Sequence, residues 1–174
     1  MSRFVLIAIL CLWVGPTAQG QSLRQLSPTE LHGNVQGHVL RLSLHGRKYT
    51  VRLDSTVDAA AIDSFRVLDV SKRADTLFVL LTLNGPSRGR GGEMGYCGAG
   101  SEGYVLWARL PAGVGSPPTI VRYDSCFHNI SDGSWTIGRD SIVGEWFTPA
   151  GRIRATYRPA APGAGIRMVS LPKP

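Results

Sequence analysis

The chain has 174 residues, is 43% hydrophobic, and carries 19 Lys and Arg against 12 Asp and Glu, a formal net charge of +7. This length corresponds to one domain that is large enough to bury a core. The positive charge suits an anionic partner, but no polybasic tail and no basic motif interleaved with aromatic residues favours nucleic acid.

The first twenty residues, MSRFVLIAILCLWVGPTAQG, predict a cleaved export signal. An apolar stretch runs from Phe4 to Val14, and Ala18 and Gly20 supply the small residues of a cleavage site. The stretch is too short for a stop-transfer helix, and no later segment is long and apolar enough to span a membrane. We therefore expect a periplasmic or extracellular protein whose mature chain, residues 21–174, is a single β-rich domain.

One or two short helices are expected near the mature N-terminus. Ser27 can cap a helix, Pro28 suits its first position, and Glu30 completes a Ser-x-x-Glu capping box. Residues 58–63, DAAAID, are compatible with a second short helix. Elsewhere the helical period is missing and a period of two dominates, which indicates strands.

The clearest strand pair lies in VLRLSLHGRKYTVRLD, residues 39–54. A two-residue loop at Gly46-Arg47, with its leading glycine, predicts a type II′ turn. All apolar positions then share one face. The predicted pairs are Leu44 with Tyr49, Leu42 with Val51 and Leu40 with Leu53 on the apolar face, and Arg41 with Arg52 on the polar face.

More strands are predicted along the rest of the chain. Residues 76–83, TLFVLLTL, are continuously apolar, which is typical of a strand covered on both faces, and YVLWARL at 104–110 is similar. The other candidate strands cover residues 65–70, 119–127, 134–138, 141–147, 153–157 and 166–171, the last within a Pro/Gly/Ala-rich tail over 159–174. About nine or ten short strands separated by turns predict an all-β fold, an antiparallel sandwich or barrel.

The segment GAGSEG, residues 98–103, formally matches the G-x-G-x-x-G dinucleotide fingerprint. That fingerprint needs a helix after the glycines, because the helix N-terminus holds the pyrophosphate. Here Gly103 leads directly into a predicted strand, so no nucleotide site is indicated. The glycines of the 84–103 loop instead indicate positive φ angles and close backbone approach. We expect Glu102 to accept hydrogen bonds from N–H groups of this loop.

Two other sequence patterns do not indicate a functional site. Residues 85–89, GPSRG, match the G-x-S-x-G of serine hydrolases, but glycines rather than a helix follow Ser87. The spacing of the four histidines does not match that of zinc ligands in known zinc sites. These histidines are His32, His38, His45 and His128. We therefore expect neither a metal nor a cofactor.

Two cysteines, Cys97 and Cys126, remain after signal cleavage. In an oxidising compartment a disulfide between them is the default expectation, and it would stabilise the fold by about 3–4 kcal/mol. The alternative is a reactive cysteine with His128 as its base.

The run YCGAGSEGYVLWARL, followed by YDSCFHNI, resembles small exported bacterial proteins of uncharacterised function. These share a Cys-Gly-Ala-Gly-x-Glu stretch, a strand, and a second Cys after a Ser. The likeness covers residues 75–147. It implies export, a disulfide and a β-rich domain, and it implies no chemistry.

Basic side chains on sheet faces form a candidate binding surface for an acidic protein or an anionic envelope component, although a solvated face is the alternative. Its residues are Arg41, His45, Arg47, Lys48, Arg52, Arg152 and Arg154. The first hypothesis is therefore a non-catalytic exported binding protein, inhibitor-like or immunity-like.

The second hypothesis is a small envelope hydrolase that uses the Gly-rich loop, because carboxylates perform acid–base catalysis once a pocket shifts their pKa values. Its candidate loop residues are Ser87, Arg88, Arg90, Glu93 and Glu102, with Asp124 nearby.

Overall fold

The computed structural model describes residues 24–59, 62–87, 100–111 and 116–172. In chain order its elements are β1 (Arg24–Gln25), the 3₁₀ turn η1 (Pro28–Glu30), β2 (Leu31–Gln36), β3 (Val39–Leu44), β4 (Arg47–Arg52), β5 (Ser64–Arg73), β6 (Thr76–Pro86), β7 (Ser101–Leu110), β8 (Thr119–Ser125), β9 (Ser131–Ile137), β10 (Ile142–Thr148), β11 (Gly151–Tyr157), the 3₁₀ turn η2 (Pro162–Ala164) and β12 (Arg167–Leu171).

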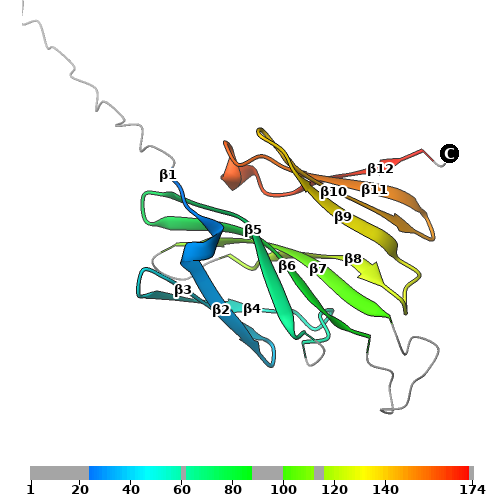
Figure 1. Cartoon of the computed structure of the whole chain (residues 1–174), viewed down its shortest axis with the longest axis horizontal. Helices are drawn as coiled ribbons and strands as arrows, with labels where there is room; N and C mark the ends of the chain where they lie inside the picture. The colour runs from blue at the N-terminus through cyan, green and yellow to red at the C-terminus, as the bar shows by residue number, and fades with distance from the viewer. Residues whose placement is uncertain (1–23, 60–61, 88–99, 112–115, 173–174) are drawn as a thin grey trace, which may run out of the picture.

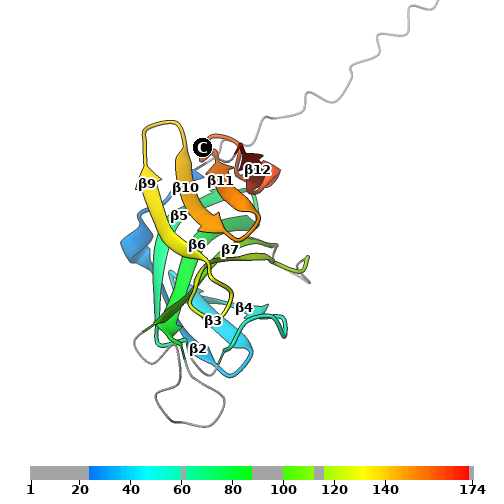
Figure 2. The same ribbon diagram turned by 90° about the vertical axis from the view of Figure 1, so that its right-hand side faces the viewer.

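The described strands form three antiparallel sheets stacked in three layers (Figure 1). A five-stranded sheet, in the order β1-β5-β6-β7-β8, is the middle layer. The three-stranded sheet β2-β3-β4 covers one of its faces and the four-stranded sheet β12-β11-β10-β9 covers the other, as Figure 2 shows from the side. The all-β antiparallel prediction is confirmed. The described part forms three open sheets and no closed barrel.

The first core lies between the three-stranded sheet and the middle sheet. Alternate residues of β3, β4 and the residue after β4 point into it and are buried, namely Leu40, Leu42, Leu44, Tyr49, Val51 and Leu53. Leu77, Val79, Leu81 and Leu83 of β6 face the same core from the other side. The predicted apolar face of the hairpin is therefore confirmed.

The register of this hairpin differs from the prediction by two residues. Its loop is His45-Gly46, with φ angles of 48° and 78°, the left-handed pair of a type I′ turn. As a result Arg41 pairs with Thr50, and the predicted pairing of Arg41 with Arg52 is wrong. A slip of two residues keeps every side chain on its face, because the strand period is two, so the apolar pattern fits both registers equally.

The second core lies on the other face of the middle sheet. Leu80 of β6 and Tyr123 of β8 pack there in one cluster with Trp146 and Tyr157 of the four-stranded sheet. All residues of Leu77–Leu83 are buried; the odd-numbered ones belong to the first core and Leu80 to the second. The prediction that this strand is covered on both faces is confirmed.

A β-bulge in β5 turns a carboxyl group into the second core. Val67 pairs with Leu81, but Asp69 pairs with the next residue, Leu80, so one residue of β5 is extra. Leu68 and Asp69 then both lie on the second-core side. There the Tyr157 hydroxyl donates to Asp69 Oδ2 at 2.7 Å, a buried link between the middle and four-stranded sheets.

The two predicted N-terminal helices are not confirmed. Pro28–Glu30 is a single 3₁₀ turn, closed by a 2.8 Å hydrogen bond from the Ser27 N–H to Glu30 Oε2, and the chain continues directly into β2. The described residues of the 58–63 segment contain no helix. No helix within the described ranges is long and apolar enough to cross a membrane. The predicted export signal, residues 1–20, lies outside those ranges.

The link between Tyr157 and Asp69 predicts a pH-dependent stability. Burial, and after it the charge of Asp69, raises the pKa of Tyr157 well above its ordinary value. The unfolded chain releases the Tyr157 proton near pH 10, whereas the folded chain retains it. The stabilisation of the fold by this hydrogen bond is therefore complete below about pH 10 and declines as the pH rises further. Tyr157→Phe should cost about 1–3 kcal/mol at neutral pH and flatten the alkaline decline, measured by urea unfolding from pH 7 to about pH 11.

The flattening should be partial, because burial also raises the pKa of Tyr123. An alkaline decline in Tyr157→Phe as steep as in the wild type would contradict this assignment.

Candidate functional site

The outer face of the three-stranded sheet carries three exposed cations, Arg41, Lys48 and Arg52. They share this face because they alternate with the buried residues of β3 and β4. Arg41 donates a hydrogen bond to the Gln36 side chain. Among the described residues, none of the three cations forms an ion pair with a carboxylate. The positive charge of this face is therefore not neutralised within the described part of the chain.

The two other predicted residues at this end of the hairpin have local partners. His45 Nε2 lies 3.0 Å from Glu30 Oε1; the His45 side chain is exposed and that of Glu30 is partly exposed. The Arg47 guanidinium lies over the ring of Tyr49, 5.9 Å from its centroid. These contacts hold the hairpin tip against η1 and place Arg47 beside the first core.

Arg152 and Arg154 do not belong to the same surface. They lie on β11 in the other outer layer, separated from the hairpin by the middle sheet (Figure 1). Both donate to Glu145 of β10, and the hydrogen bond from Arg154, with that from Arg152, lowers the pKa of Glu145. Arg152 also stacks over Phe147, which is 42% exposed.

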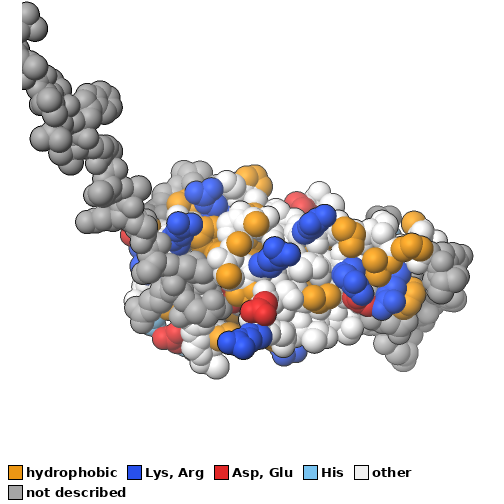
Figure 3. All heavy atoms as spheres, turned by 90° about the horizontal axis from the view of Figure 1, so that it is seen from above, with side chains coloured by type: hydrophobic (Ala, Val, Ile, Leu, Met, Phe, Trp, Pro, Cys, Tyr) orange, Lys and Arg blue, Asp and Glu red, His pale blue; other side chains and the backbone are white. Residues whose placement is uncertain are grey.

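The face above the four-stranded sheet therefore mixes cations with apolar side chains. Figure 3 shows blue arginine and orange apolar side chains gathered around a red carboxylate at one end of this face. Since Glu145 is the shared partner of Arg152 and Arg154, its one negative charge offsets one of their two positive charges. The seven predicted residues thus separate into a hairpin group, in which Arg41, Lys48 and Arg52 have no carboxylate partner among the described residues, and a β11 pair that shares Glu145.

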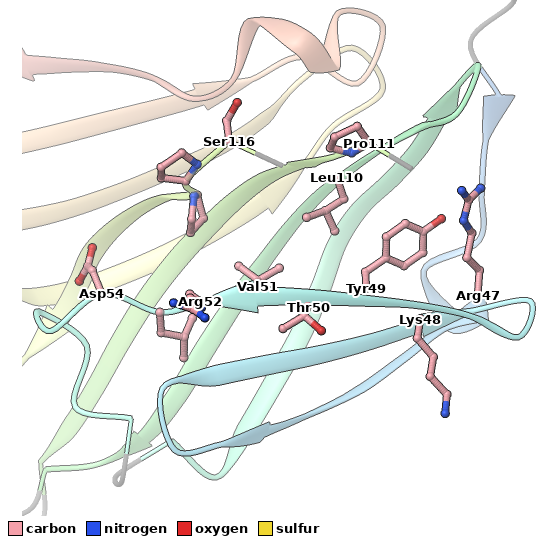
Figure 4. A pocket seen from close by; sticks show the side chains of 13 residues that line it. Arg47, Lys48, Tyr49, Thr50, Val51, Arg52, Asp54, Leu110, Pro111 and Ser116 are labelled. Carbon is pink, nitrogen blue, oxygen red and sulfur yellow. The ribbon is translucent and has the colours of Figure 1, made fainter. Parts of the chain in front are cut away.

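A groove that was not predicted runs along β4. It has a volume of about 670 Å³ and lies between β4 on one side and the end of β7 with the residues before β8 on the other (Figure 4). Its lining is Arg47, Lys48, Tyr49, Thr50, Val51, Arg52, Leu53, Asp54, Leu110, Pro111, Ser116, Pro117 and Pro118. The only hint in the sequence was the pair Pro117-Pro118, which signals irregular backbone but does not say what that backbone faces.

Glu102 is buried within a polar cluster. Its Oε1 accepts hydrogen bonds from the hydroxyls of Ser87, at 3.1 Å, and Ser125, at 2.8 Å. Its Oε2 lies 3.4 Å from Arg122 Nε. The acceptor role of Glu102 was predicted, but the donors found in the described residues are side chains rather than N–H groups of the loop.

Arg122 connects this cluster to the segment after the hairpin. Its Nη2 donates to the Thr56 carbonyl at 2.8 Å and to the Tyr104 hydroxyl at 3.2 Å, and its guanidinium lies 5.1 Å from the centre of the Tyr104 ring. The same Tyr104 hydroxyl accepts the Asp58 N–H at 3.2 Å. Glu102 is therefore part of a network that fastens residues 54–58 to β7 and β8.

Of the described residues in the hydrolase hypothesis, Ser87 and Glu102 are hydrogen-bonded to each other, but Asp124 does not join them. Asp124 pairs with Gly103 and Glu102 pairs with Ser125, so the two carboxylates point to opposite faces of the sheet. The side chain of His128 is exposed, and its backbone N–H donates to Ser125 Oγ. Neither the β4 groove nor a smaller cavity beside η2 contacts Glu102. Arg88, Arg90, Glu93 and Cys97 lie outside the described residues.

In the described part of the chain, no three His, Cys, Asp or Glu side chains are arranged to hold a metal ion. The buried carboxylate at Glu102 is instead satisfied by two hydroxyls and one guanidinium, which is the arrangement that makes a buried charge tolerable. The geometry of this cluster supports a structural role.

Glu102→Ala should lower the free energy of unfolding by about 2–4 kcal/mol, because it removes the acceptor of two hydroxyls and the ion-pair partner of Arg122. Glu102→Gln, which keeps an acceptor oxygen, should cost less. Urea unfolding would measure both, and Asp75→Ala, in an exposed turn, is the matched control and should change stability by less than about 0.5 kcal/mol. A Glu102→Ala protein as stable as the control would remove the structural assignment.

Comparison with known proteins found no match for this chain. No protein-family model matches the chain, and neither a curated protein nor a solved structure matches it. The function of this chain must therefore be inferred from its own geometry and charge.

Proposed function

We propose that this chain is a non-catalytic, exported binding protein of the cell envelope, inhibitor-like or immunity-like, whose partner is an acidic protein or an anionic envelope component. The observation that carries the proposal is the exposed, uncompensated positive charge of Arg41, Lys48 and Arg52 on the three-stranded sheet. Export is supported by the signal-like first twenty residues and by the resemblance to small exported proteins.

The hairpin is a suitable platform because its inner face is locked into the first core. Tyr49 and Val51 are buried directly behind the exposed cations of β4. Side chains on such a rigid strand lose little backbone freedom when a partner binds, which lowers the entropic cost of binding. Complementary charge of this kind chiefly accelerates association and selects the partner.

A disulfide between Cys97 and Cys126 is part of the proposal. A Cβ built on Gly100 would lie 2.6 Å from Cys126 Cβ and 3.3 Å from its Sγ. The chain therefore passes against Cys126 only three residues after Cys97, which supports a covalent closure of the Gly-rich loop at this point. The bond would fix the loop without adding a catalytic group.

Protein purified from an oxidising compartment should yield a peptide linking Cys97 to Cys126 by mass spectrometry without reductant. Reduction should then lower stability by about 3–4 kcal/mol, since the unfolded chain regains the freedom of the 97–126 loop. The double variant Cys97→Ser, Cys126→Ser should unfold like the reduced wild type. Two free thiols in the native protein would revive the reactive-cysteine alternative.

The binding proposal predicts a charge effect that is specific to the hairpin. Combined substitutions Arg41→Glu and Arg52→Glu should slow association with an anionic probe, polyglutamate, at least tenfold, because the field of this face reverses. Surface plasmon resonance at low and high ionic strength would measure the association rate, and wild-type binding should weaken with salt.

The double variant Arg152→Glu, Arg154→Glu is the matched control, because it changes the net charge by the same amount and both arginines lie on the other outer layer, paired with Glu145. It should leave polyglutamate association within about twofold of the wild type. Equal losses in both variants would mean that net charge, rather than the hairpin face, attracts the probe. Failure of the wild type to capture any component of envelope extract, together with no polyglutamate binding, would overturn the proposal.

A further inference from the structure

The outer edge of β4 is open. This strand pairs with β3 on one side and with no described strand on the other. The Leu53 N–H donates to the His38 carbonyl at 3.0 Å, and backbone pairing alternates along an antiparallel strand. It follows that Lys48, Thr50 and Arg52 direct their N–H and C=O groups to the open edge.

The groove lies directly beside this edge and its floor is apolar. Figure 4 shows Tyr49 and Val51 directed into the groove toward Leu110, while Lys48 points away from it. Pro111, Pro117 and Pro118 line the far side, and prolines have no N–H to donate. The volume, about 670 Å³, is within the usual size of ligand pockets, about 300–1,000 Å³.

The groove exists because the covering layer is narrower than the sheet beneath it. The upper side of the first core has three strands, whereas the middle sheet has five. On the β2 side the two layers are in contact, because Gly33 packs close to Phe65 of β5. On the β4 side the groove separates β4 from Leu110 and the residues before β8. One additional strand beside β4 would extend the cover over this uncovered strip.

We infer that β4 binds an extended acidic peptide segment by strand addition, as a fourth strand of the three-stranded sheet. This inference rests on the proposed function and specifies its partner. Every described pairing in this chain is antiparallel, so the added strand is taken as antiparallel. Main-chain hydrogen bonds supply affinity in this mode, and alternate side chains supply specificity.

The register predicts the sequence of the partner. Residues opposite Lys48, Thr50 and Arg52 point to the outer face, where Lys48 and Arg52 are exposed cations, so acidic residues fit there. Residues opposite Tyr49 and Val51 point into the groove, where apolar β-branched side chains fit. The expected pattern is acidic and apolar residues in strict alternation, represented by Glu-Val-Glu-Val-Glu.

The test uses the full mature protein and a fluorescent Glu-Val-Glu-Val-Glu peptide, with binding followed by anisotropy. In the proposed register the glutamate N–H groups face β4 and the valine N–H groups face solvent. N-methylation of the central glutamate should weaken binding at least tenfold, while N-methylation of a valine should change it less than about threefold. Both peptides keep the same charges and side chains, so the comparison isolates the backbone bonds.

Three protein variants complete the test. Thr50→Pro removes an N–H from the open edge without removing a bond to β3, and should weaken binding at least tenfold; Arg52→Glu should do the same through charge. A thermal melt shows whether Thr50→Pro folds, and the N-methyl comparison on the wild type stands whether or not it does. Leu110→Arg, which fills the groove floor, should also weaken binding.

The outcomes separate this inference from the proposed function. Equal binding of the two N-methylated peptides, or no peptide binding while polyglutamate is still captured through Arg41 and Arg52, would overturn strand addition and leave the proposed function standing. Loss of all acidic binding, polyglutamate included, together with no capture of any component of envelope extract, would overturn both.

Discussion

Every residue from Leu77 to Leu83 is buried, so the middle sheet has to be covered on both of its faces. Burial of apolar surface is the main favourable term in folding, and a sheet with two apolar faces can satisfy it only between two other layers. The hairpin β3–β4 and the strands β9–β12 supply these layers from opposite ends of the chain. The three-layer architecture is the consequence.

The same requirement decides where buried polar groups lie. Asp69 meets Tyr157 on one side of the middle sheet, and Glu102 meets Arg122 near the other. Each pair joins segments that are distant in sequence, so each satisfies a buried polar group and also fixes one segment on another. Carboxylates of this kind resemble catalytic candidates in a sequence, but their partners here are structural.

A partner would meet the outer surface, where the exposed faces of the three-stranded and four-stranded sheets differ in how their charges are paired. On the four-stranded sheet Arg152 and Arg154 share the carboxylate of Glu145, whereas Arg41, Lys48 and Arg52 have no carboxylate partner in the described ranges. The hairpin face is also bordered by an open strand edge and an apolar groove. Edges of this type are usually protected by charge against unwanted pairing, and the same charges would select an acidic strand.

The sequence alone predicted the strands from β3 onward, the buried face of the hairpin and the coverage of the strand at 76–83 on both faces, because period-two patterns and apolar runs are local signals. It did not predict β1 or β2. It placed the candidate cations on strands, yet it did not decide the hairpin register, since slipping by two residues leaves Leu42 and Val51 on the same face. The turn at His45-Gly46 made that choice. The tertiary structure decided three further features: the bulge at Asp69, the separation of Arg41 from Arg152, and the groove that Leu110 lines. Each depends on how sheets stack and which edge stays uncovered, and such contacts join residues whose sequence separation carries no periodic signal.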